Sequence, residues 1–401
     1  MIENILSDKF KTDKKLTTKL SLGDFNIKNS DVEIDYNKFI TVRKEHPDYI
    51  KLMNGTYSSK FRSIPLEAFN PNPNAEFAFT TFELIPVVNI IKESYIRLFY
   101  EIVKPQYFLI LLGPVLFCLI SIAKFQIVLN WVDVVLLLSS LFSVSAFVNI
   151  QRTLVEHFSN TTLFATAPTS NILKKGLVTA SQLKIISKFF LLISFLLSIP
   201  LILKNTIPVL TVIGLSFLFL NLINRKSKYG ENIFSLLFSA LSHFLVSGPL
   251  LTLGVFLVFV DSVHFDIKLL TTCLVYGTSW GLWVLLLRQL RSFRKIFLFS
   301  KSKIYRFSSV IGFDRSLQIL QKSIIIFPLV STALLALIPN GWLLCLVSSV
   351  VHSNFMIKEI NLLNKIQSTF ASASEELSEV SMKHHYVLAI SQTIAFIFFK
   401  L

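Results

Sequence analysis

Long apolar runs constrain this chain more than any other feature of its sequence. From Tyr107 onward, runs of about 18 to 22 apolar residues recur, and each is long enough to cross the roughly 30 Å of hydrocarbon in a bilayer. The composition agrees with this pattern, because 53% of the 401 residues are hydrophobic and only 16% are charged, against roughly 25% in soluble domains. The sequence therefore predicts an all-α polytopic membrane protein.

The charges between these runs support a count of nine membrane-spanning helices. Loops after the second, fourth, sixth and eighth runs contain several Lys or Arg residues, whereas the other loops contain few. Because basic loops remain on the cytoplasmic side, the N-terminus is predicted to be cytoplasmic. The fifth run contains Gly248-Pro249 and is predicted to be kinked or broken there. The predicted spans are about 107–124, 132–149, 183–203, 207–224, 233–260, 268–288, 322–338, 341–357 and 384–400.

Two further segments precede the first span. Residues 1–80 form a predicted polar cytoplasmic extension that is partly ordered, and it is either a small docking domain or a loosely ordered tail. Within residues 81–105, apolar side chains recur at helical spacing from Phe82 to Val103. This spacing predicts an amphipathic helix along the cytoplasmic interface. Residues 106–401 are the predicted transmembrane domain.

The positive net charge does not indicate a nucleic-acid partner. There are 39 Lys and Arg residues against 24 Asp and Glu residues, but the excess lies in loops predicted to be cytoplasmic, as membrane orientation requires. The three cysteines, Cys118, Cys273 and Cys345, lie far apart in apolar runs, without the spacing of a metal site or a disulfide framework. The bias towards Lys, Asn, Phe and Ile is compatible with an AT-rich genome, which suggests a bacterial inner membrane.

The most basic stretch lies between the sixth and seventh spans, at residues 288–322. It contains nine Lys or Arg residues and a single acid, Asp314. One interpretation is that these cations only orient the protein and contact the anionic inner leaflet. The other is that some of them bind a phosphorylated or otherwise anionic headgroup. The residues alone leave both interpretations open.

Several short stretches match one family of membrane enzymes. They are Lys104-Pro105 followed by LLGPVL, Lys175-Gly176 before an apolar helix, and KYGENIFSLL followed by SGPLLTLG. Together with nine helices and large loops after the second and sixth, they resemble the menaquinone-type branch of the UbiA superfamily of intramembrane prenyltransferases. The resemblance covers roughly residues 100–401. It implies a UbiA-like bundle around a cavity that is open to the membrane.

In that family, two Asp-rich motifs hold Mg²⁺ ions, which bind the diphosphate of a prenyl donor and help it to depart. The first motif would follow the second span. There Asn149 fits the family pattern, but Ile150 and Thr153 occupy the positions of the expected carboxylates. Glu156 is the acid nearby, and it is out of register with the motif.

The second motif would follow the sixth span, and it is also altered. Arg294 fits the pattern, Lys295 reverses the charge of an expected aspartate, and Phe299 stands where the last acid would be. With Arg291, these residues would repel Mg²⁺ and attract phosphate directly. No metal and no cofactor are therefore predicted, although the resemblance by itself implies Mg²⁺.

Two functions of different class remain open. The first is a divergent UbiA-like protein that binds a polyprenyl or other long-chain lipid; if it is an enzyme, it is a prenyltransferase-like transferase. The missing carboxylates disfavour Mg²⁺-dependent prenyl transfer. The second is a non-catalytic membrane scaffold whose residues 1–80 dock a soluble partner. The first hypothesis assigns the lipid headgroup or diphosphate to Asn149, Glu156, Glu231, Arg291, Arg294 and Lys295.

Among the ionisable residues within or at the edge of the predicted spans are His243, His352 and Glu231. His243 and His352 fall in the fifth and eighth spans, and ionisable groups inside a membrane indicate function by default. A hydrogen bond to a neighbouring helix is the simpler interpretation of each histidine. Glu231 begins the fifth span, where it either faces the cavity or stabilises the helix N-terminus by its charge.

Overall fold

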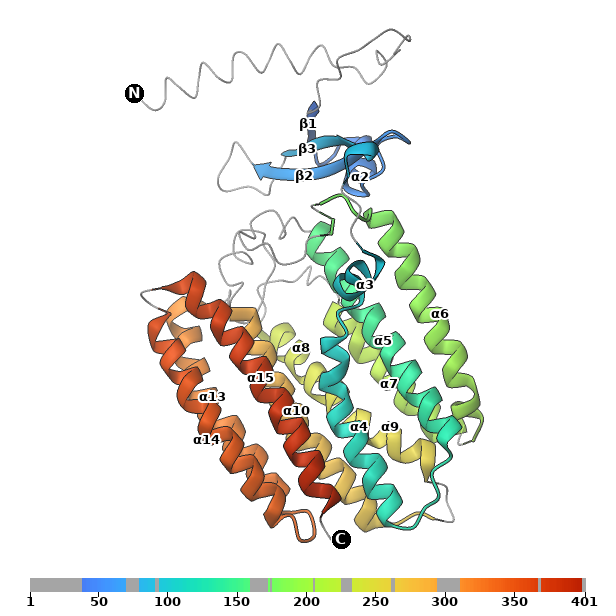
Figure 1. Ribbon diagram of the computed structural model, residues 1–401, viewed down its shortest axis with the longest axis vertical. Coiled ribbons are helices and arrows are strands. Elements are labelled where there is room, and N and C mark those ends of the chain that lie inside the picture. The colour runs from blue at the N-terminus through green and yellow to red at the C-terminus, as the bar shows by residue number, and fades with distance from the viewer. Residues whose placement is uncertain are drawn as a thin grey trace. The chain divides into compact units, whose positions relative to one another are not determined.

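The computed structural model describes residues 38–69, 79–90, 94–158, 172–173, 175–204, 206–224, 233–260, 264–293, 311–366 and 369–398. The chain divides into two compact units, Met1–Lys38 and Phe39–Leu401, and the described residues after Lys38 all lie in the second. This second unit contains a small β-sheet followed by a series of long helices (Figure 1).

A three-stranded sheet opens the described chain. Its strands are β1 (Lys38–Arg43), β2 (Phe61–Phe69) and β3 (Phe79–Pro86). Their order is β1-β3-β2, and β2 pairs antiparallel with β3. The helix α2 (Pro47–Met53) begins with a proline, whose backbone suits a first helical turn. The apolar core of this β-unit, which we define as residues 39–86, consists of Val42, Tyr49, Leu52, Met53, Phe82 and Leu84.

The predicted amphipathic helix is wrong in its first half. Phe82 and Leu84 are buried residues of β3, so β3 joins the sheet across the boundary drawn at residue 80. Helical spacing misled the prediction because the two-residue alternation of β3 was overlooked. After the short 3-10 helix Val87–Asn89, the helix in this region is α3 (Tyr95–Val103), and its interfacial position stays a prediction.

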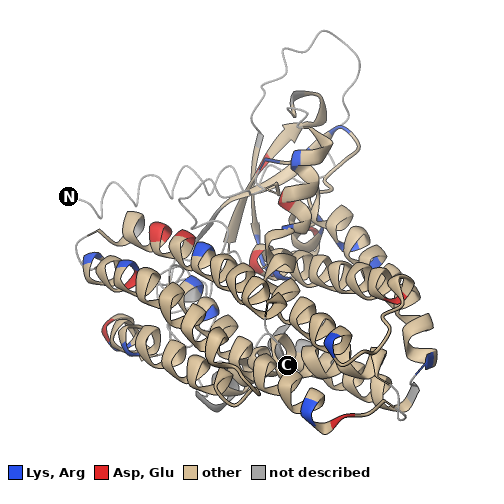
Figure 2. Cartoon of the chain, turned by 60° about the horizontal axis from the view of Figure 1, so that its bottom comes forward, with Lys and Arg blue, Asp and Glu red and all other residues tan. Residues whose placement is uncertain are grey.

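The rest of the described chain is helical. The helices are α4 (Gln106–Lys124), α5 (Trp131–Phe158), α6 (Ala180–Lys204), α7 (Thr206–Asn224), α8 (Ile233–Ser247), α9 (Pro249–Phe259), α10 (Ile267–Phe293), α13 (Phe313–Leu335), α14 (Trp342–Lys365) and α15 (Phe370–Ile397). Within the described residues, 7 segments are long and apolar enough to cross a membrane, one of which joins parts of α8 and α9. Charged residues lie mainly near helix ends and connections (Figure 2). The chain is therefore an integral membrane protein.

Each of the predicted spans falls on these helices, but the count of nine and the cytoplasmic N-terminus stay predictions. Among the described residues, α7 contributes a shorter apolar stretch, Ile207–Ser216. The first half of α15 exposes Glu375, Glu376 and Glu379, so its composition departs from that of a membrane span.

The predicted break in the fifth span is confirmed. α8 ends at Ser247 and α9 begins at Pro249, and Gly248 between them lies against α10. A Cβ atom on Gly248 would lie 2.3 Å from the carbonyl oxygen of Gly277, and one on Gly281 would lie 2.7 Å from the carbonyl oxygen of Phe244. Gly277 and Gly281 are four residues apart, the small-xxx-small spacing that lets membrane helices approach closely.

Enlarging Gly281 is expected to destabilise the protein, because the obstructing atoms of α8 include its backbone. We predict that Gly281→Leu lowers the free energy of unfolding by about 1–3 kcal/mol, as overpacking does elsewhere. The matched control is Gly214→Leu on α7, since a Cβ atom at Gly214 meets nothing within 4 Å. Thermal unfolding of both variants in detergent tests the prediction. Equal losses of stability would contradict the close approach of α8 and α10.

An aromatic core joins α4, α10 and α15. Trp280 is 1% exposed, and its indole N–H donates to the carbonyl oxygen of Ile110 at 3.1 Å. Tyr276 stacks on Phe117 with 3.6 Å between the ring centroids, and Phe117 also contacts Phe396 of α15. This core fixes the relative positions of the helices whose ends carry the charged residues described next.

Candidate functional site

Charged and aromatic residues from four helices meet at the end of the bundle where α4 begins. Tyr107 lies in the first turn of α4, Arg152 and Glu156 near the end of α5, Arg291 in the last turn of α10, and Tyr386 on α15. The guanidinium carbon of Arg291 lies 4.6 Å from the centroid of the Tyr107 ring. Arg291 also interacts electrostatically with Arg152 and Tyr386. We call these five residues the cationic cluster.

The cationic cluster has an excess of positive charge. The Arg152 Nε atom lies 3.5 Å from a carboxylate oxygen of Glu156, in an ion pair one helical turn long. The Arg152 and Arg291 guanidinium groups are close enough to repel each other. Two guanidinium groups against one carboxylate leave a net positive charge, which favours an anion at this end of the helices.

Two tyrosines shape the cluster without neutralising it. The Tyr107 ring contacts Arg291 through its face, and the Tyr386 hydroxyl donates to the carbonyl oxygen of Gln106 at 2.9 Å. A cation over an aromatic face keeps its charge, since the ring offers only a quadrupole. Arg291 is thus positioned by a neutral neighbour, with its charge available to a ligand.

Asn149 has a structural contact one turn before this cluster. It is 8% exposed, and its side-chain amide donates to the carbonyl oxygen of Val103 at 3.1 Å, which ties the end of α3 to α5. Thr153 accepts from the Lys104 ammonium group at 3.2 Å and donates to the carbonyl oxygen of Asn149 at 3.0 Å. Binding of a headgroup by Asn149 stays a prediction.

The six predicted site residues are only partly covered by the structure. Glu156 and Arg291 both interact with Arg152 in the cationic cluster, although they are far apart in sequence. Glu231, Arg294 and Lys295 lie outside the described residues.

The cluster residues do not fit Mg²⁺. That ion requires several oxygen ligands, chiefly carboxylates and water. At the two positions where carboxylates are expected on α5, Ile150 is 1% exposed and Thr153 accepts from Lys104. Glu156 is paired with Arg152. Within the described residues, no group of three or more His, Cys, Asp or Glu side chains could hold a metal ion.

Sequence reasoning missed Tyr107, Arg152 and Tyr386. Arg152 follows the second predicted span, and its spacing of four residues from Glu156 is the signal that indicates a helical ion pair. Tyr107 lies two residues after Pro105, at the predicted start of a span, where tyrosines anchor helices to the membrane interface. For Tyr386 the local sequence gives no signal, because its partners lie far away in the chain.

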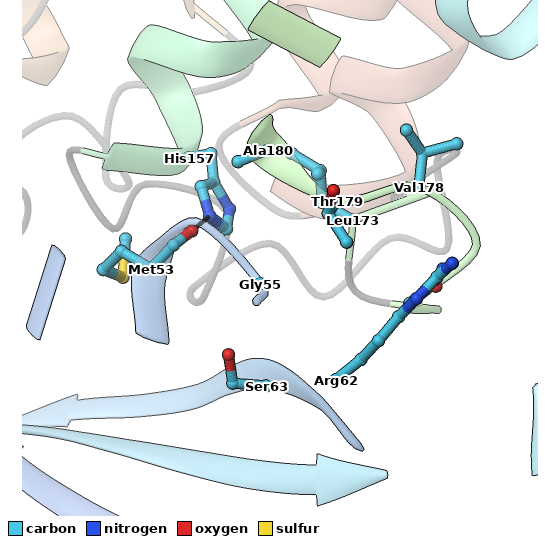
Figure 3. Close-up of a pocket in the computed structure, with 10 residues that line it drawn as sticks. Met53, Gly55, Arg62, Ser63, His157, Leu173, Val178, Thr179 and Ala180 are labelled. Atoms are coloured by element: carbon cyan, nitrogen blue, oxygen red, sulfur yellow. Dashed lines mark hydrogen bonds between the residues drawn. The ribbon is translucent and has the colours of Figure 1, made fainter. Parts of the chain in front are cut away.

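A small hollow lies between the β-unit and the start of α6 (Figure 3). Its walls include Arg62 and Ser63 of β2, His157 of α5, and Thr179. The space inside it that is open to a water-sized molecule is about 10 Å³, far below the roughly 300–1,000 Å³ of typical ligand pockets. Partial burial lowers the pKa of the Arg62 guanidinium, which stays protonated because the free value exceeds about 12.

Hydrogen bonds across this hollow tie the β-unit to the helices. A ring nitrogen of His157 lies 2.8 Å from the carbonyl oxygen of Met53, as Figure 3 shows. Lys184 donates to the Asn54 side chain at 2.8 Å, and Arg62 donates to the carbonyl oxygen of Gly176. Gly176 has a φ of 66°, which glycine adopts without strain. The hollow therefore serves as a joint between the β-unit and the helices.

Comparisons with known proteins find likeness only at the level of three-dimensional structure. No protein-family model matches the chain, and no curated protein matches its sequence. A structure described as concerning digeranylgeranylglyceryl phosphate synthase in membranes is 14% identical, covers 76% of this chain and 99% of its own, and has a TM-score of 0.48. A UbiA homolog from Archaeoglobus fulgidus, bound to GPP and Mg²⁺, is 10% identical, covers 73% and 99%, and has a TM-score of 0.47. TM-scores of this size do not establish a shared fold.

Proposed function

We propose that this chain is a divergent UbiA-like membrane protein that binds a polyprenyl or other long-chain lipid with an anionic headgroup. The observation that carries the proposal is the meeting of Arg152 and Arg291 at one end of the helices. These helices, α5 and α10, are the two from which the family's metal-binding motifs would extend. By sequence, Lys295 stands where the second motif would place an aspartate, and Ile150 and Thr153 stand where the first would place carboxylates.

Phosphate is the chemical group that this arrangement suits best. Guanidinium groups bind phosphate oxygens with paired, charge-assisted hydrogen bonds, and the Tyr107 hydroxyl lies next to Arg291. Arg294 and Lys295 follow α10 directly and would add two cations, while Asn149 and Glu231 remain supporting candidates. The apolar chain of the lipid would lie along the membrane-spanning helices.

Prenyl transfer with Mg²⁺ is not part of the proposal. In the family, Mg²⁺ neutralises the departing diphosphate. Here the described cluster contains two guanidinium groups and one paired carboxylate. Its net positive charge repels a divalent cation. A bound lipid phosphate would be held without such an ion, and the predicted bacterial inner membrane supplies anionic long-chain lipids in abundance.

A non-catalytic scaffold is the second candidate, and the β-unit favours it. This unit has its own core and is tied to α5 and α6 by His157 and Lys184. Such a unit can dock a soluble partner, as predicted for the N-terminal extension. On this account the cations of the helix ends only orient the protein and contact anionic lipids.

Native mass spectrometry of the purified chain separates these candidates. We expect one class of anionic long-chain lipid to remain bound, and Arg291→Gln to lose most of it. The control is Arg315→Gln at the start of α13, which removes an exposed guanidinium group and leaves the cluster intact. No retained lipid, or equal loss in both variants, would favour the scaffold.

A further inference from the structure

A second group of ionisable side chains lies buried among α10, α14 and α15. Glu359 and His352 belong to α14, and His384 and His385 belong to α15. Their exposed fractions are 1%, 4%, 1% and 1%, respectively. Burying an ionisable side chain is costly unless the group is paired or gives up its charge, so each of these residues requires a partner.

Three of these residues form a line of hydrogen bonds. The Nδ1 atom of His384 lies 3.1 Å from a carboxylate oxygen of Glu359. The Nε2 atom of the same ring lies 3.0 Å from Nδ1 of His352. His384 therefore contacts Glu359 with one nitrogen and His352 with the other. We call these three residues the relay.

Aromatic rings hold both imidazoles of the relay in place. Trp283 stacks on His352 with 4.2 Å between the ring centroids and 22° between the planes. Phe355 stacks on His384 at 4.7 Å and 7°. Trp283 also meets His384 edge to face at 4.8 Å. Apolar faces of this kind exclude water, so the charge of Glu359 has to be balanced within the relay.

No other charge among the described residues faces Glu359. On α13, the charged residues Asp314, Arg315 and Lys322 are exposed. On α10, Arg288 donates to Ser239 of α8 and Arg291 lies in the cationic cluster. The remaining charged residues of α14 and α15 are exposed: Lys358, Lys365, Glu375, Glu376, Glu379 and Lys383. Lys124 of α4 donates to the carbonyl oxygen of Phe396.

His385 is the other titratable group facing the relay. It interacts electrostatically with His384, and its ring meets Trp280 edge to face at 4.6 Å. Within the described residues, the Nε2 atoms of His352 and His385 are buried without a hydrogen-bond partner. The Glu359 carboxylate contacts His384, so it stabilises a proton on His384 in preference to one on His385.

The sum of the charges on Glu359, His384 and His352 then determines how many protons the relay holds. With an ionised Glu359 and two neutral imidazoles, the relay carries a net negative charge in an apolar environment. One additional proton makes it neutral. An unbalanced buried charge costs several kcal/mol, so the neutral state is favoured. In that state, an imidazolium at His384 donates from both nitrogens, to Glu359 and to Nδ1 of His352, and His352 keeps its own proton on Nε2.

We propose that Glu359, His384 and His352 form a buried proton-binding site that holds one proton. The ligand of this site is the proton itself, taken up by an imidazole beside a buried carboxylate. The site is separate from the cationic cluster and does not depend on its function. Removing the Glu359 carboxylate removes the negative charge that stabilises the proton on the relay. Removing an exposed carboxylate elsewhere leaves that charge in place.

The fluorescence of Trp283 reports on the relay, because a protonated imidazole in contact quenches an indole more strongly than a neutral one. The experiment uses the full chain in nanodiscs with Trp131 and Trp342, both exposed, replaced by Phe. On raising the pH, we expect the fluorescence to increase in one transition as the proton leaves. Trp283→Phe should abolish this transition, which assigns it to the relay.

Glu359→Gln is the deciding variant. Its transition should move down by about 1–3 pH units, the size of the effect that a nearby opposite charge has on protonation. Glu379→Gln, an exposed glutamate of α15, should titrate like the unaltered chain. If Glu359→Gln does not fold, His352→Phe gives the same comparison, because it removes a hydrogen-bond acceptor of the imidazolium but keeps stacking on Trp283. Absence of a transition between about pH 5 and 10, or identical transitions in all variants, would overturn the proposal.

Discussion

Replacing Trp280 by alanine is expected to lower the free energy of unfolding by about 3–5 kcal/mol, the range observed when large buried aromatic side chains are deleted. Trp280 is 1% exposed, stacks near Tyr276 and donates to the backbone of α4 at Ile110. Gly113 of α4 packs directly against its indole, since a Cβ atom there would lie 2.9 Å from the ring. The substitution leaves a large cavity and an unpaired carbonyl group where α4 and α10 meet.

Trp342→Ala is the matched control for this prediction. The same side chain is removed, but Trp342 is 66% exposed at the start of α14. We expect its stability in detergent to change by less than about 1 kcal/mol. Thermal unfolding followed by helical circular dichroism provides the measurement for both variants. Similar losses in both would show that the aromatic core does not hold α4 to α10.

The double variant Arg152→Gln/Arg291→Gln is expected to weaken the binding of a prenyl phosphate by about tenfold to a hundredfold. A hydrogen bond to a charged group contributes about 1.5–3 kcal/mol, and about 1.4 kcal/mol corresponds to a factor of ten in affinity. The two guanidinium groups act on one ligand, so their effects need not add. Equilibrium binding of a radiolabelled prenyl phosphate to the detergent-purified chain measures the change.

The control for this effect removes the same number of charges elsewhere. Arg315→Gln/Lys322→Gln on α13 neutralises two exposed cations outside the cluster. If binding depends on the cluster, this control keeps the affinity of the unaltered chain. If both double variants weaken binding equally, the interaction is a general attraction between a basic protein and an anion.

The helical part of the fold was largely predictable, because a membrane-spanning helix is recorded in a continuous stretch of sequence. Length and apolarity locate each helix, and Gly248-Pro249 locates the break between α8 and α9. The Gly277 and Gly281 spacing on α10 was also readable and was overlooked. β3 was misread, because a short strand with Phe82 and Leu84 gives a weaker pattern than a helix of twenty residues.

The candidate sites were predictable only in part, since they depend on contacts between distant segments. The resemblance pointed to the ends of α5 and α10, where Arg152 pairs with Glu156 and interacts with Arg291, and a binding role for these residues stays a prediction. Tyr386 joins them from a segment with no recognisable motif. The expected hydrogen bond of His352 to a neighbouring helix is confirmed by His384. Its continuation to Glu359 was not foreseen, because the packing of α14 against α15 brings these residues together.

The central claim is that cations, and not Mg²⁺, hold the headgroup of a long-chain lipid. The most direct test measures binding of a labelled prenyl diphosphate to the purified chain, once with excess Mg²⁺ and once with EDTA, while the same samples are assayed for transfer to aromatic acceptors. The account predicts equal affinity in both conditions and no transferred product. Binding that requires Mg²⁺, or a prenylated product that forms only with Mg²⁺, would contradict it.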